Sequence, residues 1–186
     1  MKVLRDKTKL YTFEEALQIY EGIKPPRLTS TEMILLLLYS TNKPLYGRTL
    51  FMKELFLLKE EVLKNHYGNE SLEDLHYVPF RFGMYSFKIG KLVEELEFAE
   101  YVERRGKKNT RDESFALTEK GREHARELLD RIPEDVLDKV RLCRTGWDEL
   151  GTDGILRYVY QHYPQYTDRS ELKKKYKRIT WGRGRG

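Results

Sequence analysis

Few of the residues that usually carry enzyme chemistry occur together in this sequence. The four histidines, His66, His76, His124 and His162, are dispersed, and no two stand at a helical spacing that would present two metal ligands. The single cysteine, Cys143, cannot form a zinc knuckle or an intramolecular disulfide, and a packed thiol is its commoner role. We therefore expect no catalytic residue, no metal site and no cofactor, and we interpret the chain as non-enzymatic.

Positively charged residues gather around one predicted helix, and their chemistry is that of phosphate binding. Ser86 is the predicted N-cap, and the apolar stripe from Ile89 to Ala99 predicts an amphipathic helix. Segments 101–102 and 115–117 then predict the strands of a hairpin with GKKNTRD at its tip. In winged-helix proteins that bind DNA, such a helix enters the major groove and the hairpin, called the wing, contacts phosphates. The candidate nucleic-acid-binding residues are Arg81, Lys88, Lys91, Arg104, Arg105, Lys107, Lys108 and Arg111.

The C-terminal segment is a further candidate for phosphate contacts. Residues 173–186, KKKYKRITWGRGRG, hold seven basic residues, no acidic residue, one Tyr and one Trp. Such segments bind single-stranded DNA or RNA by phosphate attraction and stacking, and a solubilising end is the alternative. GRGRG is no phosphate-binding loop, because it lacks the Lys-Ser/Thr pair and a preceding strand. The candidate residues of this tail are Lys173, Lys174, Lys175, Arg183 and Arg185.

The distribution of charge tells against indiscriminate DNA binding by the rest of the chain. The formal net charge is +5, but without residues 173–186 the chain holds 28 basic residues against 30 acidic ones. Glu94, Glu95, Glu97 and Glu103 belong to the same helix and hairpin, and they would face phosphates unless they point away. The charge pattern leaves open a solvated hairpin on a fold that contacts another protein.

An aromatic segment ahead of this helix is the candidate surface for a protein partner. FRFGMYSF, residues 80–87, contains four aromatic residues of the kind that anchor protein interfaces: Phe80, Phe82, Tyr85 and Phe87. The interval from Lys64 to Ser86 is far longer than the turn of about 3 to 4 residues in a helix-turn-helix. The loop that replaces this turn could therefore be a recognition surface itself.

The order of the predicted elements gives the fold class. A short helix begins at Thr12, a central helix begins at Ser30 or Thr31 and stops at Pro44, and residues 48–64 form a third helix with Lys53 off its apolar face. Further helices follow the hairpin. This order predicts an α+β, mostly helical fold: a winged-helix-like domain with a β-hairpin wing and a C-terminal helical appendix. The predicted parts are an N-terminal helical arm (1–27), the winged-helix-like domain (28–146), the helical appendix (147–177) and a basic flexible tail (178–186).

Three segments resemble the Panacea and YwgA-like proteins. RTLFMKELFLL and FRFGMYSFKIGKLVEELEFAEYVERR are similar to two helical segments of that family, and FALTEKG is similar to its wing exit. The resemblance spans residues 30–125, and Met84 stands where the family usually has Pro. It implies a winged-helix-like fold found in bacterial and archaeal proteins, some of them antitoxins that neutralise a toxin by protein contact. It does not imply catalysis.

Two functions of different kinds are thus expected. The first is a winged-helix DNA-binding protein in transcription regulation, with nucleic acid as its partner. The second is an antitoxin-like module that binds a toxin-like protein through the four aromatic residues. We expect a cytoplasmic location and no membrane partner, because the N-terminus lacks the apolar core of a signal peptide and the longest apolar run, Met33–Tyr39, is too short to cross a bilayer. The dense charge fits a thermophile.

The tyrosines of the appendix have three interpretations. Tyr158, Tyr160, Tyr163 and Tyr166, with Trp147, could stack on bases, anchor a protein partner or pack half-buried in the core. Tyrosine at helical spacing is more often a half-buried core residue. The sequence leaves open whether the chain forms a homodimer, for which this appendix is the expected place.

Overall fold

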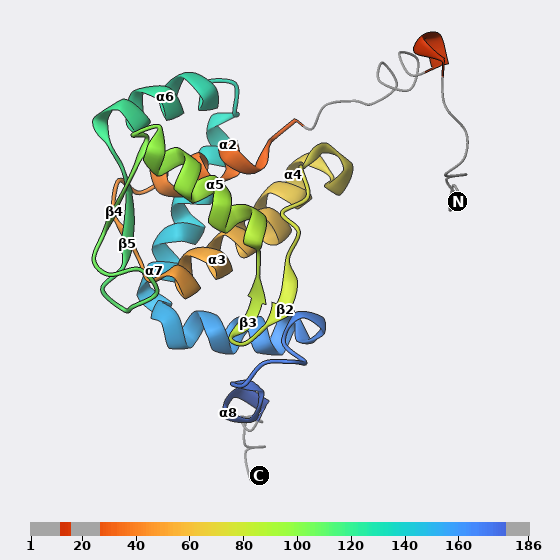
Figure 1. Ribbon diagram of the computed structural model, residues 1–186, viewed down its shortest axis with the longest axis vertical. Helices are drawn as coiled ribbons and strands as arrows, with labels where there is room; N and C mark the ends of the chain where they lie inside the picture. The colour runs from red at the N-terminus through yellow and green to blue at the C-terminus, as the bar shows by residue number, and fades with distance from the viewer. Residues whose placement is uncertain (1–11, 16–26, 178–186) are drawn as a thin grey trace.

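Helix α2, Ser30–Tyr39, lies at the centre of the protein because it is apolar on every side. The computed structural model describes residues 12–15 and 27–177, and in that part the six residues from Met33 to Leu38 are all buried. The N-cap is Thr29, one residue earlier than expected, and it forms a capping box with Glu32: each side chain bonds the other residue's backbone N–H. Figure 1 shows α2 enclosed by α3, α5 and α6.

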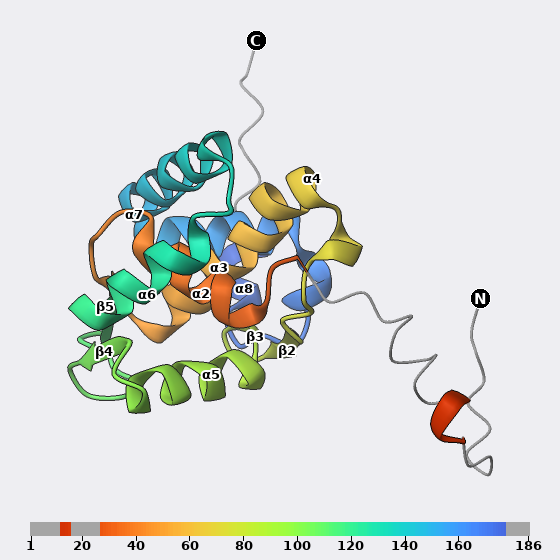
Figure 2. The ribbon, with the colours of Figure 1, turned by 90° about the horizontal axis from the view of Figure 1, so that it is seen from above.

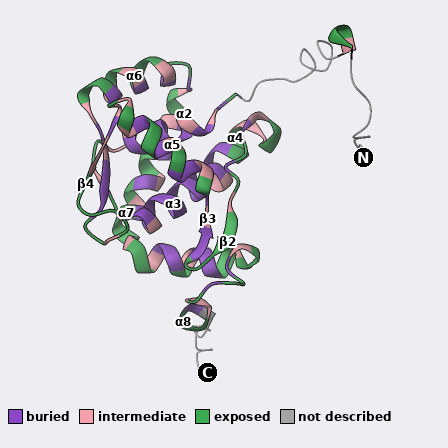
Figure 3. Ribbon diagram, viewed as in Figure 1, coloured by how far each residue is buried: buried purple, intermediate pink, exposed green. Residues whose placement is uncertain are grey.

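The predicted third helix is confirmed and continues further than expected. It comprises α3, Arg48–Leu57, a π-helical segment η1, Leu58–Leu63, and one last turn α4, Lys64–Tyr67. The expectation that Lys53 lies off the packed face is wrong, since its exposed fraction is 2%. The reason is that α7 covers one side of α3 and β3 covers another, so that little of the helix meets solvent (Figure 3).

The predicted hairpin is confirmed, and a third strand joins it. β4, Val102–Arg105, and β5, Ser114–Leu117, pair antiparallel, with Val102 opposite Leu117. β1, Leu45–Tyr46, pairs with the other edge of β5, which gives the sheet order β1-β5-β4. A two-residue strand leaves no periodic pattern, so β1 could not be predicted from the sequence. We call the β4–β5 hairpin and its loop, residues 102–117, the wing.

A second, two-stranded sheet precedes the helix of the candidate site. After a short 3-10 turn η2, Asn69–Ser71, the strands β2, Val78–Phe80, and β3, Gly83–Tyr85, form a tight hairpin. We call residues 78–85 the aromatic hairpin. Helix α5, Phe87–Phe98, follows it directly and leads into the wing.

The FALTEKG segment joins the wing to helix α6, Glu119–Leu129, by a close backbone contact. Thr118 caps the helix by accepting a hydrogen bond from the Gly121 N–H, and it donates to the Glu100 carbonyl. A Cβ at Gly121 would lie 1.9 Å from the Tyr101 carbonyl oxygen. Glycine is therefore required where α6 crosses the start of β4.

The C-terminal part of the chain packs back on the rest. α7, Glu134–His162, bends at Gly151, whose φ of 62° lies in the left-handed region that favours glycine. It is followed by η3, Pro164–Tyr166, and the short helix α8, Lys173–Lys177. The predicted boundary at residue 146 falls within α7. Figure 2 shows the first half of α7 at one margin of the molecule and α5 at the opposite margin.

The predicted arm and tail lie largely outside the described residues. Of the arm, the structure describes residues 12–15, where Thr12 and Glu15 form a capping box, and residue 27. The tail positions Arg183 and Arg185 fall outside the described part of the chain.

Candidate functional site

Helix α5 is fixed on the core by one face and leaves the other open. The Ser86 hydroxyl caps it by accepting from the Ile89 N–H at 3.1 Å, and it donates to the Leu75 carbonyl. The buried face consists of Ile89, Gly90, Val93 and Leu96. Figure 2 shows the helix along the margin of the molecule, with no element drawn outside it. The predicted cap is therefore confirmed, and so is the stripe at Ile89, Val93 and Leu96, whereas Leu92 and Ala99 are only half-buried.

Three of the four aromatic residues of the candidate protein site pack together at the start of α5, and the fourth, Phe82, lies in the turn of the aromatic hairpin. The rings of Phe80, Tyr85 and Phe87 pack on one another with centroids 5.0 to 5.6 Å apart. Phe80, Phe82 and Phe87 are exposed, and Phe82 occupies the turn between the strands. We call these four residues the aromatic cluster. Large apolar rings held on each other and open to solvent have the composition of a protein-binding hot spot.

The aromatic hairpin is held from beneath by groups that the sequence did not indicate. The buried Lys53 ammonium donates to the Met84 carbonyl at 2.6 Å, and burial lowers the pKa of Lys53 to about 7. The Arg81 carbonyl accepts from the Glu171 N–H at 2.9 Å and from the Ser170 hydroxyl at 2.8 Å. The cluster is therefore presented on an anchored support and needs little ordering when it binds a partner.

The cations ahead of and on α5 are paired with carboxylates of the same chain. Arg81 lies 3.0 Å from Glu171, at the tip of the aromatic hairpin. The Lys88 ammonium lies 2.5 Å from the Glu73 carboxylate and also donates to the Asp74 carbonyl. Lys91 lies 3.6 Å from Glu95, one turn further along α5.

Three cations of the wing are paired in the same way. Arg104 lies 3.0 Å from Glu97 of α5, and Arg105 lies 2.7 Å from Glu103 on the same strand. Lys108 forms an ion pair with Glu94 of α5, which lowers the pKa of Glu94. These carboxylates occupy the surface where phosphates would have to bind.

Lys107 and Arg111, at the tip of the wing, differ from the other candidates. Both are exposed, and in the described part of the chain neither has a carboxylate partner. The structure therefore places six of the eight candidate cations in ion pairs and leaves two of them open to an external anion.

A buried ion pair that the sequence analysis missed lies at the loop end of the wing. The Arg48 guanidinium holds the Glu113 carboxylate with two hydrogen bonds of 2.7 and 3.3 Å, and Glu113 is fully buried. Glu113 also accepts from the Asn109 N–H in the wing loop at 2.9 Å. Burial lowers the pKa of Arg48, but Glu113 and the Tyr85 hydroxyl outweigh this effect and raise it. Arg48 thus ties the loop of the wing to α3 and to the aromatic cluster.

A second buried ion pair joins α3 to α7. Arg144 and Glu54 are both buried and lie 2.9 Å apart, and Arg144 also pairs with Asp148. Burial raises the pKa of Glu54, and the neighbouring Arg144 guanidinium opposes this effect. Because paired charges inside a protein mostly fix an arrangement, we assign this group to the packing of α7.

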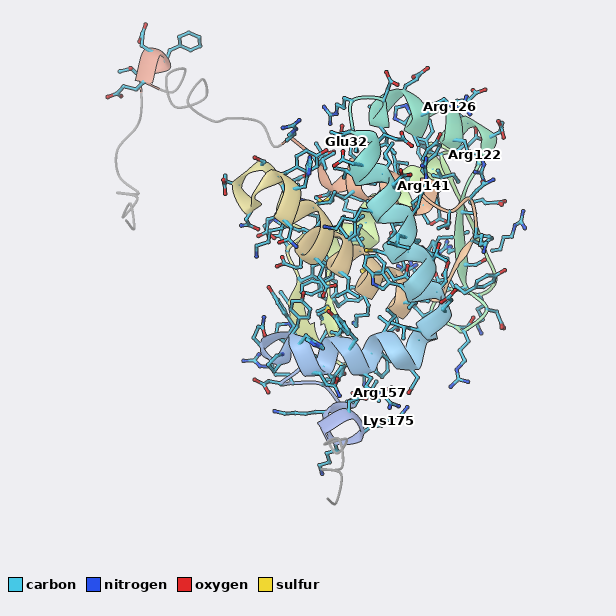
Figure 4. The ribbon with its side chains drawn as sticks, turned by 180° about the vertical axis from the view of Figure 1, so that it is seen from behind. Glu32, Arg122, Arg126, Arg141, Arg157 and Lys175 are labelled. Carbon is cyan, nitrogen blue, oxygen red and sulfur yellow. The ribbon has the colours of Figure 1, made fainter. Side chains whose placement is uncertain are left out.

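Two of the described tail cations, Lys173 and Lys175, are also engaged with their own chain. Lys173 lies 2.7 Å from Asp168, and Lys174 is exposed. Lys175 lies 2.7 Å from Asp153, and together with Tyr176 and Arg157 it lowers the pKa of Asp153 to about 2. Figure 4 shows Arg157 and Lys175 side by side where α8 meets α7. This contact joins α8 to the rest of the appendix.

The tyrosines of the appendix pack on the core, as the commoner interpretation predicts. Tyr163 and Tyr166 are half-buried and meet the Phe56 ring edge to face, with centroids 4.8 and 5.2 Å apart. The Tyr163 hydroxyl donates to Glu61 at 3.0 Å. Tyr160 is buried against Tyr176, at 5.0 Å between centroids. These contacts hold the appendix to its own chain.

The remaining chemical groups form no further site in the described residues. No three His, Cys, Asp or Glu side chains there are arranged to hold a metal ion. Cys143 is half-buried, and burial raises the pKa of its thiol. No described helix is both long enough and apolar enough to cross a membrane.

No family model matches the sequence of this chain, and no curated protein matches it.

Proposed function

We propose that this chain is a winged-helix-like protein-interaction module that binds a partner polypeptide through the aromatic cluster. The three helices α2, α3 and α5, followed by a hairpin whose β5 strand pairs with β1, support the winged-helix-like interpretation. The observation that carries the proposal is the exposed packing of Phe80, Tyr85 and Phe87 on an anchored hairpin. An antitoxin-like role is one function of this kind, with a toxin as the partner.

The ion pairs favour a protein partner over DNA as the ligand of this surface. A phosphate backbone is bound by cations that exchange their counterions for phosphates. Here Glu94 and Glu97 on α5 already pair with Lys108 and Arg104 of the wing. To bind phosphates, Lys108 and Arg104 would have to break these ion pairs. The carboxylates of Glu94 and Glu97 would remain nearby and repel the phosphates. An apolar cluster beside internally neutralised charges is suited to a protein surface.

Affinity capture with matched variants tests this proposal. The tagged full chain, Phe82→Ala and Arg111→Ala are compared by quantitative mass spectrometry, and the captured protein is then purified and titrated. We expect Phe82→Ala to weaken binding by about 2 kcal/mol, or about 30-fold, because it removes an exposed anchor. Arg111→Ala should leave binding unchanged. A partner whose affinity does not depend on Phe82, Phe80 or Phe87 would contradict the proposal.

Duplex binding is the second candidate function, favoured by the two open cations at the tip of the wing. Lys107 and Arg111 are placed on the loop that would contact the backbone in a winged-helix protein. A gel-shift titration at two salt concentrations, with and without residues 173–186, tests it. This function predicts affinity that falls steeply with salt and falls again in Lys107→Ala/Arg111→Ala. Duplex binding by the wing would be contradicted if the affinity were lost on removal of residues 173–186 but unchanged in Lys107→Ala/Arg111→Ala.

A further inference from the structure

The open face of α5 carries four residues in one straight row. Phe87, Lys91, Glu94 and Phe98 stand at positions i, i+4, i+7 and i+11, which a helix places on one side. All four are exposed, and with Glu95 they make up the exposed set of this helix. At a rise of about 1.5 Å per residue, the two phenylalanines lie about 16 Å apart along the axis. We call these four residues the α5 row.

Phe98 is the most exposed large apolar residue described here, with 93% of its surface open to solvent. It lies at the far end of α5 from the aromatic cluster, so the cluster does not account for it. The row also begins with an exposed phenylalanine, since Phe87 is 62% exposed. Two exposed phenylalanines at the ends of one row indicate a surface that another molecule covers.

The α5 row is complementary to itself when a second helix runs in the opposite direction. Phe87 and Phe98 are equally far from the midpoint of the row, and so are Lys91 and Glu94. An antiparallel copy therefore places Phe98 opposite Phe87, and Lys91 opposite Glu94 and the neighbouring Glu95. A parallel copy would instead set Lys91 against Lys91 and glutamate against glutamate. Only the antiparallel arrangement pairs opposite charges between two apolar contacts.

We infer that α5 is the interface of a two-fold homodimer, in which the rows of two copies pack antiparallel. Phe98 of the second copy then lies against Phe87, where the rings of Phe80 and Tyr85 supply further apolar surface. Lys91 exchanges its loose contact with Glu95, at 3.6 Å, for Glu95 of the second copy and for its Glu94, which keeps the ion pair with Lys108 of the wing. The inference rests on the proposed function in one respect: both require that the aromatic cluster binds protein, and here the bound protein is a second copy of the chain.

Analytical ultracentrifugation of the full chain over a range of concentrations tests this interface by charge reversal. Lys91→Glu makes every facing charge in the row negative, and Glu94→Lys/Glu95→Lys makes every one positive. Each variant alone should be a monomer. Mixed in equal amounts they should form a heterodimer, because each negative row then faces a positive one. Thermal unfolding of each variant checks that it is folded, since all three positions are exposed.

Phe98→Ala provides the apolar half of the test, with Leu142→Ala as its matched control. Phe98→Ala should weaken dimerisation at least about tenfold, because each dimer loses two buried phenylalanines. Leu142 is 75% exposed on the first half of α7, at the opposite margin of the molecule in Figure 2, and its replacement should change nothing.

Three results would overturn the inference. The wild-type chain could be monomeric at every concentration, both charge-reversal variants could still form the dimer, or the mixture of the two variants could stay monomeric. In each case, loss of partner binding in Phe82→Ala would still support the proposed function, since Phe82 lies outside the α5 row. Loss of the dimer together with Phe82-independent partner binding would refute both.

Discussion

The buried pair at the loop end of the wing gives the sharpest prediction for stability. Replacing Arg48 by Ala removes both hydrogen bonds, of 2.7 and 3.3 Å, from a Glu113 carboxylate that has no exposed surface. What remains for Glu113 is the Asn109 N–H at 2.9 Å and Arg104 at 3.7 Å. We expect a loss of about 3 to 5 kcal/mol in the free energy of unfolding, because a buried charge is left without its main partner.

Urea unfolding followed by circular dichroism measures this loss, and Arg105→Ala is its control. Arg105 forms an ion pair with Glu103 at the surface, so its removal should cost no more than about 1 kcal/mol. The double variant Arg48→Met/Glu113→Leu removes both charges and should recover most of the stability of the wild type. If Arg48→Ala costs no more than Arg105→Ala, the reasoning about the Arg48–Glu113 pair is refuted.

Two further predictions concern a close backbone contact and a buried lysine. Gly121→Ala should destabilise the protein by at least about 2 kcal/mol in the same unfolding assay, because its Cβ would meet the Tyr101 carbonyl. The control is Gly146→Ala, whose Cβ would have nothing within 4 Å and which should be neutral or stabilising. Equal effects of the two substitutions would contradict the packing of α6. Between pH 7 and 10.5 the unfolded chain binds more protons at Lys53 than the folded chain does, because burial lowers its folded pKa to about 7. The stability due to Lys53 should therefore rise with pH in that window, and Lys53→Met should flatten the slope by up to about 1.4 kcal/mol per pH unit. An unchanged pH profile in that variant would show that Lys53 is not buried in solution.

Elements with strong periodicity or clear caps were predictable from the sequence. The central helix, the third helix, the Ser86 cap and the wing strands are each marked by several residues of the right type at the right spacing. The boundaries were less certain, as the N-cap at Thr29 shows. The strands β1, β2 and β3 are too short to leave a periodic pattern, and tertiary contacts place them.

The sequence could not show which charges meet. Arg48 and Glu113 are 65 residues apart, and Lys53 bonds a carbonyl 31 residues away, so neither contact follows from local spacing. The carboxylates Glu94 and Glu97 were expected near the site, but only the fold shows that they pair with Lys108 and Arg104 of the wing. Lys91 and Glu95 are the exception, because positions i and i+4 of a helix are neighbours. Phe98 is different, since its place in the α5 row was readable from helical spacing alone.

The central claim is that the aromatic cluster contacts protein, and photo-crosslinking from position 82 tests it most directly. Benzoylphenylalanine replaces Phe82 at the exposed tip of the aromatic hairpin, and the same group at Arg122 on α6 serves as the control. The account predicts adducts with polypeptide from position 82, which disappear when Phe80 is replaced by Ala and are absent from position 122. Adducts with nucleic acid, or polypeptide adducts equally abundant from both positions, would contradict it.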